Sequence, residues 1–325
     1  MHVLVIGAGG MLGVKLVNSL IVGGIPGMGP ISRLTRFDFV QSPAVKAAFA
    51  VDTLAGDLSA PGKAAELIGL RPDLIFHLAA IVSGEAEKDF DKGYRINLAA
   101  TQNLLEAIRA ERDYKPRLIF TSSIAVFGAP FPEAIEDDFF TTPLTSYGTQ
   151  KAIGELLVSD YSRRGFLDGV ALRMPTVCVR PGKPNLAASG FFSNIIREPL
   201  NGLPAVLPVP DSVRHWHASP RAATGFLLRA AGMDLGLLGN RRTLTLPGLS
   251  CTVAEQIEAL RRVAGNDAVA LIRSEPDDTI MRIVEGWPRN FAPARALELG
   301  FRSEATFDEI IRAHIEDELT PHPAG

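Results

Sequence analysis

The sequence is poor in cysteine and has no apolar run of membrane length. Its 2 cysteines, Cys178 and Cys251, lie far apart, form no CxxC pair and have no pair of histidines nearby, so neither a disulfide framework nor a metal site is indicated. We expect both thiols to be reduced and buried, because free cysteine packs as a small hydrophobe. The first residues, MHVLVIGAGG, lack the charged segment and cleavage site of a signal peptide. A cytoplasmic protein without a membrane partner is therefore expected.

The sequence also lacks a strong excess of charge of one sign. Charged residues make up 21% of the chain and the formal net charge is −3, so no basic surface for nucleic acid or acidic lipid is indicated. No repeat of roughly 20 to 50 residues is visible. A length of 325 residues suits one large domain or two interlocked ones with an ample core. We expect a globular protein without a nucleic-acid partner.

Apolar runs of strand length alternate with amphipathic segments of helix length in the first half of the chain. The expected strands are His2 to Ile6, Ile31 to Phe37, Ala48 to Leu54, Leu74 to Leu78 and Arg117 to Phe120, and the expected helices include 10–20, 63–68 and 97–109. Such alternation is typical of a parallel sheet with right-handed crossovers and helices on both faces. The sequence predicts an α/β fold, a doubly wound parallel sheet of the Rossmann type, over residues 1–172 with a later contribution near 213–248.

The regular alternation ends at about Pro175. The segment RPGKPNLAASGFFSNIIREPLNGLPAVLPVP is rich in Pro, Gly and Asn, and the elements expected after it follow no regular order. We interpret residues 173–325 as mainly a smaller, interlocked lobe that binds the substrate. Ligands of open α/β sheets bind at the carboxyl edge of the strands, so this lobe is expected to close over that edge.

Glycines follow the first expected strand directly, in GAGGMLG. Glycine at this place permits a tight turn and a close approach of the backbone to a pyrophosphate, while the helix N-terminus stabilises the anion. A flexible turn is the alternative, but the position after an N-terminal apolar strand favours a dinucleotide site. The residues assigned to it are Gly7, Gly10, Met11, Leu12 and Gly13.

An acidic residue, Asp38, ends the second expected strand and could accept both hydroxyl hydrogens of an adenosine ribose. Its charge would repel the 2′-phosphate of NADP, so NAD is the expected cofactor. Arg33 and Arg36 keep the use of NADP open. A surface aspartate in a turn is the alternative interpretation.

Two later strand ends continue this series. Asp57 and Leu58 could hold the adenine through a carboxylate and a backbone amide, and the HLAA segment offers the small residues that close contact with a dinucleotide requires. Each alone is only a plausible loop, but together they lie at successive strand ends. The residues assigned from HLAA are Leu78, Ala79 and Ala80.

Polar residues of another kind follow the fifth expected strand. LIFTSSIAVFG places Ser122 and Ser123 at the carboxyl edge of the sheet, and TSYGTQKAIGELL later places Tyr147 four residues before Lys151. Tyr147 is the only one of 4 tyrosines with a lysine at this spacing. Because side chains at this helical spacing face the same side, a stacked surface pair is the alternative to a catalytic pair.

Taken in order, these motifs resemble those of the extended short-chain dehydrogenases/reductases, the epimerase/dehydratase group. The similarity extends over nearly the whole chain and consists of GxxGxxG, an acidic strand end, Asp-Leu, HLAA, the Asn of NLAATQNLLEA, Ser-Ser near VFG, Tyr-x-x-x-Lys and RMPTVCVRPG. By position, the resemblance implies that Ser123, Tyr147 and Lys151 form the catalytic set. It implies that Asn97 is the helix asparagine of the family, with a structural role or a role in holding a water.

The resemblance also implies a chemistry. A phenol near its unperturbed pKa of ~10 is a poor base at neutral pH, but the Lys151 ammonium beside it favours the phenolate. Tyr147 would then remove a hydroxyl proton while hydride leaves the same carbon for NAD, and Ser123 would orient that hydroxyl. The residues implied to contact NAD near its nicotinamide end are Asn97, Tyr147, Lys151, Pro175 and Thr176.

The second half departs from the sugar-nucleotide members of this family. They carry an Arg-Asp-aromatic-x-His-Val-x-Asp block, whereas this chain has VRHWHASPRAA, with Pro220 where the aspartate is expected. The RPGKPNLAASGFFSNIIREPL stretch is similar instead to a branch that oxidises the 2-hydroxyl of a small sugar acid, D-erythronate. The residues proposed for such a substrate are Ser83, Ser123, Tyr147, Asn185, Ser189 and His217, with Arg173, Arg180 and Arg214 as further candidates.

Several alternatives stay open at this point. Any one of these polar residues can be structural, and a histidine beside Trp216 can be a core residue. The enzyme can be a nucleotide-sugar 4-epimerase that keeps NAD bound, or an enzyme similar to L-threonine 3-dehydrogenases. A dinucleotide sensor without activity would not need Ser123, Tyr147 and Lys151. The resemblance also implies a homodimer formed through the helices that hold NLAATQNLLEAIRA and YGTQKAIGELLVSDY.

Overall fold

The structure, a computed structural model, describes residues 1–182 and 188–319. Contacts divide the chain into two units, each built from separate stretches of sequence. The first unit contains residues 1–126, 143–174 and 224–246, and the second contains 127–142, 175–223 and 247–325. The sequence analysis assigns 127–142 to the dinucleotide-binding domain, whereas its contacts group it with the second unit.

The first unit is built on a sheet of 7 strands, with the order β11-β7-β5-β4-β1-β2-β3 and parallel pairing throughout. The strands are β1 (His2–Ile6), β2 (Arg33–Asp38), β3 (Ala50–Ala55), β4 (Leu74–His77), β5 (Arg117–Ser123), β7 (Asp168–Met174) and β11 (Thr243–Thr245). The order reverses between β1 and β4, the place where doubly wound sheets bind their ligands. The predicted fold class is confirmed.

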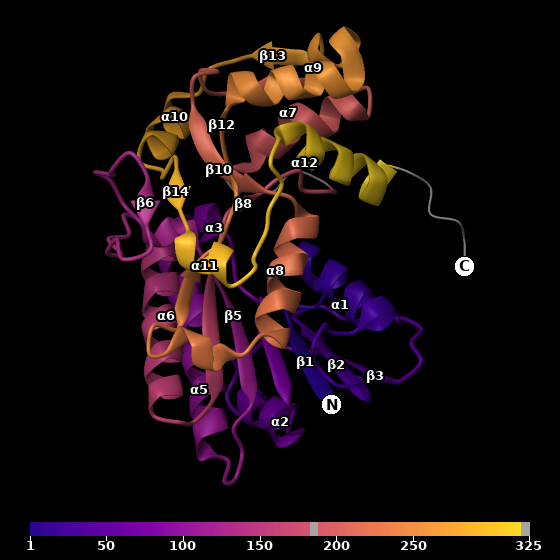
Figure 1. The fold of residues 1–325 in the computed structure, drawn as a ribbon, viewed down its shortest axis with the longest axis vertical. Coiled ribbons are helices and arrows are strands. Elements are labelled where there is room, and N and C mark those ends of the chain that lie inside the picture. The colour runs from indigo at the N-terminus through magenta and orange to yellow at the C-terminus, as the bar shows by residue number, and fades with distance from the viewer. Residues whose placement is uncertain (183–187, 320–325) are drawn as a thin grey trace. The chain divides into compact units, whose positions relative to one another are not determined.

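Helices connect these strands (Figure 1). They are α1 (Met11–Gly23), α2 (Lys63–Gly69), α3 (Ser83–Lys88), α4 (Phe90–Gly93), α5 (Ala100–Ala110), α6 (Ser146–Arg163) and α8 (Pro220–Gly232), with a π-helical turn η1 (Tyr94–Ala99) and 3-10 turns η2 (Ile124–Val126) and η3 (Leu235–Leu238). The parallel pairing requires such crossovers, because the chain must return to the same edge before each new strand.

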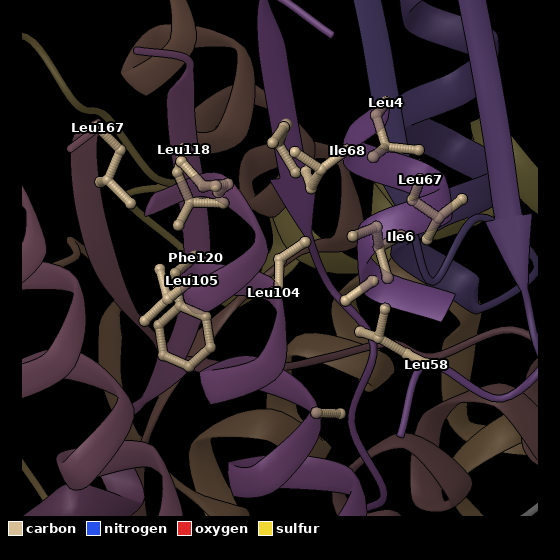
Figure 2. Packing of buried hydrophobic residues seen from close by; sticks show 14 of the residues in the cluster. Leu4, Ile6, Leu58, Leu67, Ile68, Leu104, Leu105, Leu118, Phe120 and Leu167 are labelled. Atoms are coloured by element: carbon tan, nitrogen blue, oxygen red, sulfur yellow. The ribbon is translucent and has the colours of Figure 1, made fainter. Parts of the chain in front are cut away.

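One core cluster of the first unit lies between one face of the sheet and the helices α2, α5 and α6. Strand residues in neighbouring registers form rows on this face, such as Leu4, Ile75 and Leu118. The helices add Leu67, Leu104 and Val158, among others, to the same buried cluster, part of which Figure 2 shows. Because alternate strand residues share a face, the next row carries Ile6, His77, Phe120 and Ala171.

The second unit has smaller sheets and a separate core. Its strands are β8 (Thr176–Val177), β10 (Arg214–Ala218) and β12 (Leu249–Thr252) in one sheet, β9 (Ala205–Leu207) with β13 (Ile272–Ser274), and β6 (Ile135–Glu136) with β14 (Phe291–Ala292). Its helices are α7 (Gly190–Leu200), α9 (Val253–Val269), α10 (Asp278–Glu285), α11 (Ala294–Glu298) and α12 (Phe307–His314), followed by the π-helical turn η4 (Ile315–Leu319). Buried residues of α7, α9 and α12, such as Phe192, Leu260 and Ile310, form its core.

The features that are scarce in the sequence can be compared with the structure. Cys178 and Cys251 are both free and buried, as expected. Burial raises the pKa of each thiol to about 12, so both remain protonated. Within residues 1–182 and 188–319, none of the helices has both the length and the apolar character needed to cross a membrane.

Candidate active site

The glycine turn after β1 is held tightly against the loop after β4. Gly7 has a φ of +91°, and a Cβ placed on it would lie 2.7 Å from the backbone nitrogen of Ala79. A Cβ on Gly13 would lie 2.0 Å from the carbonyl oxygen of Gly7, so α1 can start this close to the turn only with glycine there. The N-cap residue, Gly10, gives α1 no side-chain cap. The first amides of α1 are therefore suited to an anion such as a pyrophosphate.

The carboxylate of Asp38 lies beside this turn. Its Oδ2 accepts a hydrogen bond of 2.8 Å from the Gly9 amide, and its Oδ1 accepts one of 2.7 Å from the Phe39 amide. These bonds fix the carboxylate at the end of β2 next to the glycines. An acceptor held there is suited to the hydroxyl groups of a ribose.

Arg33 and Arg36, the two residues that could bind the 2′-phosphate of NADP, bind other partners. Arg36 is buried, and its Nη1 donates to the carbonyl oxygen of Pro43 at 2.8 Å; burial lowers the pKa of its guanidinium. Arg33 donates from Nε to Asp52 at 2.6 Å. Neither guanidinium is presented beside Asp38 for a 2′-phosphate, which favours NAD.

The segment after β3 is held by internal bonds. Asp57 accepts hydrogen bonds from the amide and the hydroxyl of Ser59 at 2.8 and 2.6 Å, and from Arg95 at 2.6 Å. Burial raises the pKa of Asp57, but these bonds outweigh burial, and the net shift is downward. The side chain of Leu58 packs in the core, so only its backbone could meet an adenine.

The HLAA segment joins β4 to the glycine turn. The amides of Leu78 and Ala79 both donate to the carbonyl oxygen of Ile6, at 2.8 and 3.1 Å. Ala80 follows and is half-buried. The structure therefore brings Gly7, Leu78 and Ala79 together, as the sequence analysis expects for residues that line a dinucleotide.

Asn97 lies on the π-helical turn η1 and connects this loop to α6. Its Oδ1 accepts from the Ile81 amide at 2.9 Å, and its Nδ2 donates to the Ile81 carbonyl at 3.3 Å and to Gln150 Oε1 at 2.8 Å. Gln150, which sequence reasoning missed, is completely buried. The side chain of Asn97 is thus committed to a structural clamp.

The two serines at the end of β5 have different partners. Ser122 donates from Oγ to Glu155 Oε1 at 2.5 Å, whereas Ser123 Oγ accepts from the Ala125 amide at 3.1 Å. Successive side chains of a strand point to opposite faces. Only Ser122 therefore faces Glu155 on α6, and Ser123 keeps its hydroxyl at the carboxyl edge of the sheet.

Helix α6 brings the Tyr and Lys pair to β5. Thr145 caps its N-terminus by accepting a 3.0 Å bond from the Gly148 amide. A Cβ on Gly148 would lie 2.1 Å from the Ala125 carbonyl oxygen, and a Cβ on Gly154 would lie 2.8 Å from the ring of Phe120. The glycines of YGTQKAIG thus let α6 lie directly on β5 and η2, which explains how Tyr147 reaches the strand end that carries Ser123.

Lys151 is a buried cation beneath the tyrosine. Its Nζ donates to the Thr121 carbonyl at 2.8 Å, and it lies 4.9 Å from the ring centroid of Phe120 and 5.7 Å from that of Tyr147. Burial lowers the pKa of Lys151 to about 8, and Glu155 acts in the opposite direction. At neutral pH the ammonium therefore lies beside the Tyr147 ring. A stacked pair on the surface would not need this burial, so the structure argues against that alternative.

An ion pair that sequence reasoning missed lies next to Lys151. Glu155, at 5% side-chain exposure, accepts from Arg173 at 2.8 Å, and Arg173 side-chain exposure is 11%. Sequence analysis considers Arg173 for the substrate, but its guanidinium is bound to Glu155 through both Nε and Nη2. A glutamate one turn after Lys151 on the buried face of a helix was the signal that could have found the pair.

The other predicted site residues lie in different places. Ser83 is the first residue of α3 in the first unit, while Pro175, Thr176 and Ser189 lie in the second unit. The Thr176 Oγ1 lies 2.7 Å from His215 Nε2, and Ser189 Oγ accepts from Arg180 Nη2 at 2.8 Å. Asn185 lies outside the described residues.

His217 lies in the core of the second unit. Its side chain is fully buried, its Nε2 lies 2.9 Å from Gln256 Nε2, and its ring packs against Phe192 and Phe307. Burial holds the pKa of His217 well below its ordinary value, so the ring is neutral. This is the environment of a core residue. It does not support the proposal that His217 contacts the substrate.

Comparisons with known proteins agree with this arrangement. The family model of the NAD dependent epimerase/dehydratase family matches residues 3–225. The chain is 49% identical over 321 residues to a D-erythronate dehydrogenase from Cupriavidus necator, with 98% of each chain covered. It is 41% identical over 319 residues to a D-erythronate dehydrogenase from Haemophilus influenzae, with 98% of this chain and 100% of that protein covered.

Solved structures show the same fold. A crystal structure of a nucleoside-diphosphate-sugar epimerase from Agrobacterium tumefaciens is 63% identical to this chain, with a TM-score of 0.95 and coverage of 98% of this chain and 94% of that one. An L-threonine 3-dehydrogenase from Trypanosoma brucei has a TM-score of 0.83 at 22% identity, covering 97% and 95% of the two chains, which concerns the fold alone. The glycine turn, the Tyr147 and Lys151 pair and the family match together establish that the chain belongs to the NAD dependent epimerase/dehydratase family.

Proposed function

We propose that the protein is an NAD-dependent dehydrogenase that oxidises the 2-hydroxyl of D-erythronate to give 2-oxo-tetronate. The observation that carries the proposal is the buried Lys151 ammonium beneath the Tyr147 ring, at the strand end that also carries Ser123. The similarity to two proteins named D-erythronate dehydrogenase, at 49% and 41% identity over nearly the full length, supports the substrate.

The residues around the glycine turn fit NAD. A Cβ at Gly7 or Gly13 would fill the space that the turn leaves for close backbone contact, and α1 has no side-chain cap. Gly7, Gly10, Met11, Leu12 and Gly13 would hold the pyrophosphate, Asp38 the adenosine ribose, and the segments at Asp57 and Leu78 the adenine side. When bound, NAD supplies the hydride acceptor for the reaction.

The first unit supplies the groups for proton transfer. Tyr147 removes the proton from the 2-hydroxyl while the hydride leaves the same carbon, so the C–O bond becomes a carbonyl. Lys151 favours the Tyr147 phenolate through its charge and binds the nicotinamide ribose. Ser123 donates to the reacting oxygen and orients it, and Asn97 links the Ile81 backbone to the Gln150 side chain on α6.

The proposal includes the residues of the second unit and the assembly. Pro175 and Thr176 would fix the nicotinamide amide, and Ser83 and Ser189 would contact the substrate hydroxyls. The protein would be a cytoplasmic homodimer formed through α5 and α6. Leu156, a large apolar side chain that is 70% exposed on α6, supports such a contact.

The test is a spectrophotometric screen of the purified protein with NAD and NADP. D-erythronate should reduce free NAD stoichiometrically, and L-threonine and other aldonic acids should be slower. Tyr147→Phe should abolish turnover while leaving NAD affinity nearly intact, because only the proton acceptor is removed. Activity of this variant within about tenfold of the wild type would remove Tyr147 from the mechanism.

A nucleotide-sugar epimerase is the second candidate. It is favoured by the 63% identity to a structure described as a nucleoside-diphosphate-sugar epimerase. Pro220, in place of the aspartate of the sugar-nucleotide block, argues against it. Conversion of UDP-sugars without net formation of NADH would establish the epimerase and exclude the dehydrogenase.

A further inference from the structure

A buried ionic cluster in the first unit takes part in no step described above. Glu155 on α6 accepts from Ser122 on β5 at 2.5 Å and from Arg173 on β7 at 2.8 to 3.1 Å. The residues Glu155 and Ser122 are 4% and 3% exposed. Ser122 and Arg173 are register neighbours in the sheet, so they present their donors side by side. Removing a carboxylate from water to this degree is costly, and the bonds from Ser122 and Arg173 offset part of that cost.

The position of Glu155 relates it to Lys151. The two residues are one helical turn apart, and both are buried on the side of α6 that lies on β5. Lys151 donates to the carbonyl of Thr121, and Glu155 accepts from the side chain of Ser122, the next residue of β5. The ammonium and the carboxylate are therefore anchored to consecutive residues of one strand.

We propose that Glu155, fixed by Ser122 and Arg173, is a positioning residue that keeps the ammonium of Lys151 charged and directed at Tyr147. Lys151 loses its water on burial, and the Thr121 oxygen to which it donates belongs to a neutral carbonyl. A negative charge held one turn away compensates part of that loss. Without it, the charge that activates Tyr147 would disappear at a lower pH.

The groups that face Lys151 are consistent with this role. Tyr147 and Glu155 share its helix, His77 on β4 interacts with it electrostatically, and Arg173 on β7 is paired with the Glu155 carboxylate. Burial, and to a lesser degree Lys151, lowers the pKa of His77 to about 3, so that ring is neutral. Among the groups named here, Glu155 is the one that raises the pKa of Lys151.

This inference deepens the proposed dehydrogenase and rests on it, since both use the charge of Lys151. Two measurements distinguish a failure of the role of Glu155 from a failure of the proposed reaction. The first is kcat/KM for D-erythronate against pH, which needs the proposed reaction. The second is the Kd of NAD against pH by calorimetry, which needs only the cofactor. If wild-type protein does not oxidise D-erythronate, the proposed reaction fails and the NAD titration still tests Glu155.

The central variants are Glu155→Gln and Arg173→Gln. In Glu155→Gln the pH above which activity and NAD affinity decline should fall by about one unit, because the anion is gone and Arg173 remains. In Arg173→Gln it should rise, because the carboxylate is no longer neutralised. We call the pH above which activity and NAD affinity decline the pH limit. A merely structural pair would lower activity in both variants without shifting the pH limit of either. Glu66→Gln on α2, an exposed and distant position, is the matched control and should leave the limit unchanged.

Folding must be controlled, because removal of one member of a buried pair is destabilising. Glu155→Asp keeps the charge with a shorter reach, so its pH limit should stay near that of the wild type although kcat falls. The double variant Glu155→Gln/Arg173→Gln leaves no unpaired charge and should have a limit between those of the single variants. A limit in Glu155→Gln equal to that of the wild type, or shifts of the same sign in both single variants, would overturn the proposal.

Discussion

At the scale of single residues, the charge of Lys151 that we propose to activate Tyr147 opposes the stability of the fold. Its folded pKa of about 8 lies below the value of 10.5 for an unperturbed lysine. Below pH 8 both the folded and the unfolded state hold the proton, and the whole cost of burying the ammonium is present. Between pH 8 and 10.5 only the unfolded state holds it, so the stability of the wild type rises with pH.

We therefore expect Lys151→Met to be inactive but more stable than the wild type at pH 7, by roughly 1 to 3 kcal/mol. The gain should shrink as the pH is raised from 8 to 10.5, because the wild type then loses its penalty. Urea unfolding at several pH values measures this. Lys115→Met, at an exposed position in the same unit, is the control and should change stability little. A Lys151→Met protein less stable than the wild type at pH 7 would contradict the argument.

A single residue, Asp38, is also expected to decide the preference for NAD over NADP. Asp38→Asn should narrow the ratio of kcat/KM for NAD over NADP by about tenfold or more, because a like charge no longer opposes the 2′-phosphate. Asparagine keeps an oxygen that can accept from Gly9, so the turn is preserved. Asp160→Asn, an exposed aspartate on α6, is the control. An unchanged ratio would place the selectivity elsewhere.

At the scale of elements, two glycines of α1 make a matched pair. Gly13→Ala places a Cβ 2.0 Å from the Gly7 carbonyl, so α1 must move away from the turn, whereas a Cβ on Gly23 meets nothing within 4 Å. We expect Gly13→Ala to weaken NAD binding by about tenfold or more, since the anion loses aligned amides. Gly23→Ala should bind NAD normally. Calorimetric titration of both variants decides, and equal affinities would mean that α1 does not position the cofactor.

The elements also show what the sequence could predict. The expected strand at His2 to Ile6 has the same bounds as β1, because a short apolar run next to glycines has no competing interpretation. The strand expected to end at Phe120 continues to Ser123, since β7 pairs with its polar end. The π-helical turn before α5 was not predicted. Hydrophobic periodicity indicates which face of a helix is buried, but it does not distinguish a π-helical turn from an α-helical one.

At the scale of the whole molecule, sequence reasoning finds sites made of local motifs and misses those made by tertiary contacts. The glycine turn and the Tyr147 and Lys151 pair could be recognised in the sequence because the residues of each lie close together along the chain. Glu155 and Arg173 become partners only when α6 packs on the sheet. Residues 127–142 belong to the second unit because β6 pairs with β14, which lies far along the chain. No local pattern encodes that pairing.

The whole molecule has one proposed substrate, and the carboxylate of that substrate can be tested directly. Erythritol, which lacks the carboxylate of D-erythronate, should be a far poorer substrate. The anion-binding groups would lose charge-assisted hydrogen bonds of ~1.5 to 3 kcal/mol each, a defect of one to several powers of ten in kcat/KM. Rates of NADH formation with the two compounds measure it. Equal rates would refute the sugar-acid proposal.

The clamp made by Asn97 has a consequence for motion. Because its amide binds both Ile81 and Gln150, the loop that follows β4 and helix α6 cannot open separately without breaking buried hydrogen bonds. In hydrogen exchange the amides of residues 78–81 and of the first turns of α6 should therefore behave as one cooperative unit with a common opening free energy. Bound NAD, by holding the loop, would then also protect the first turns of α6.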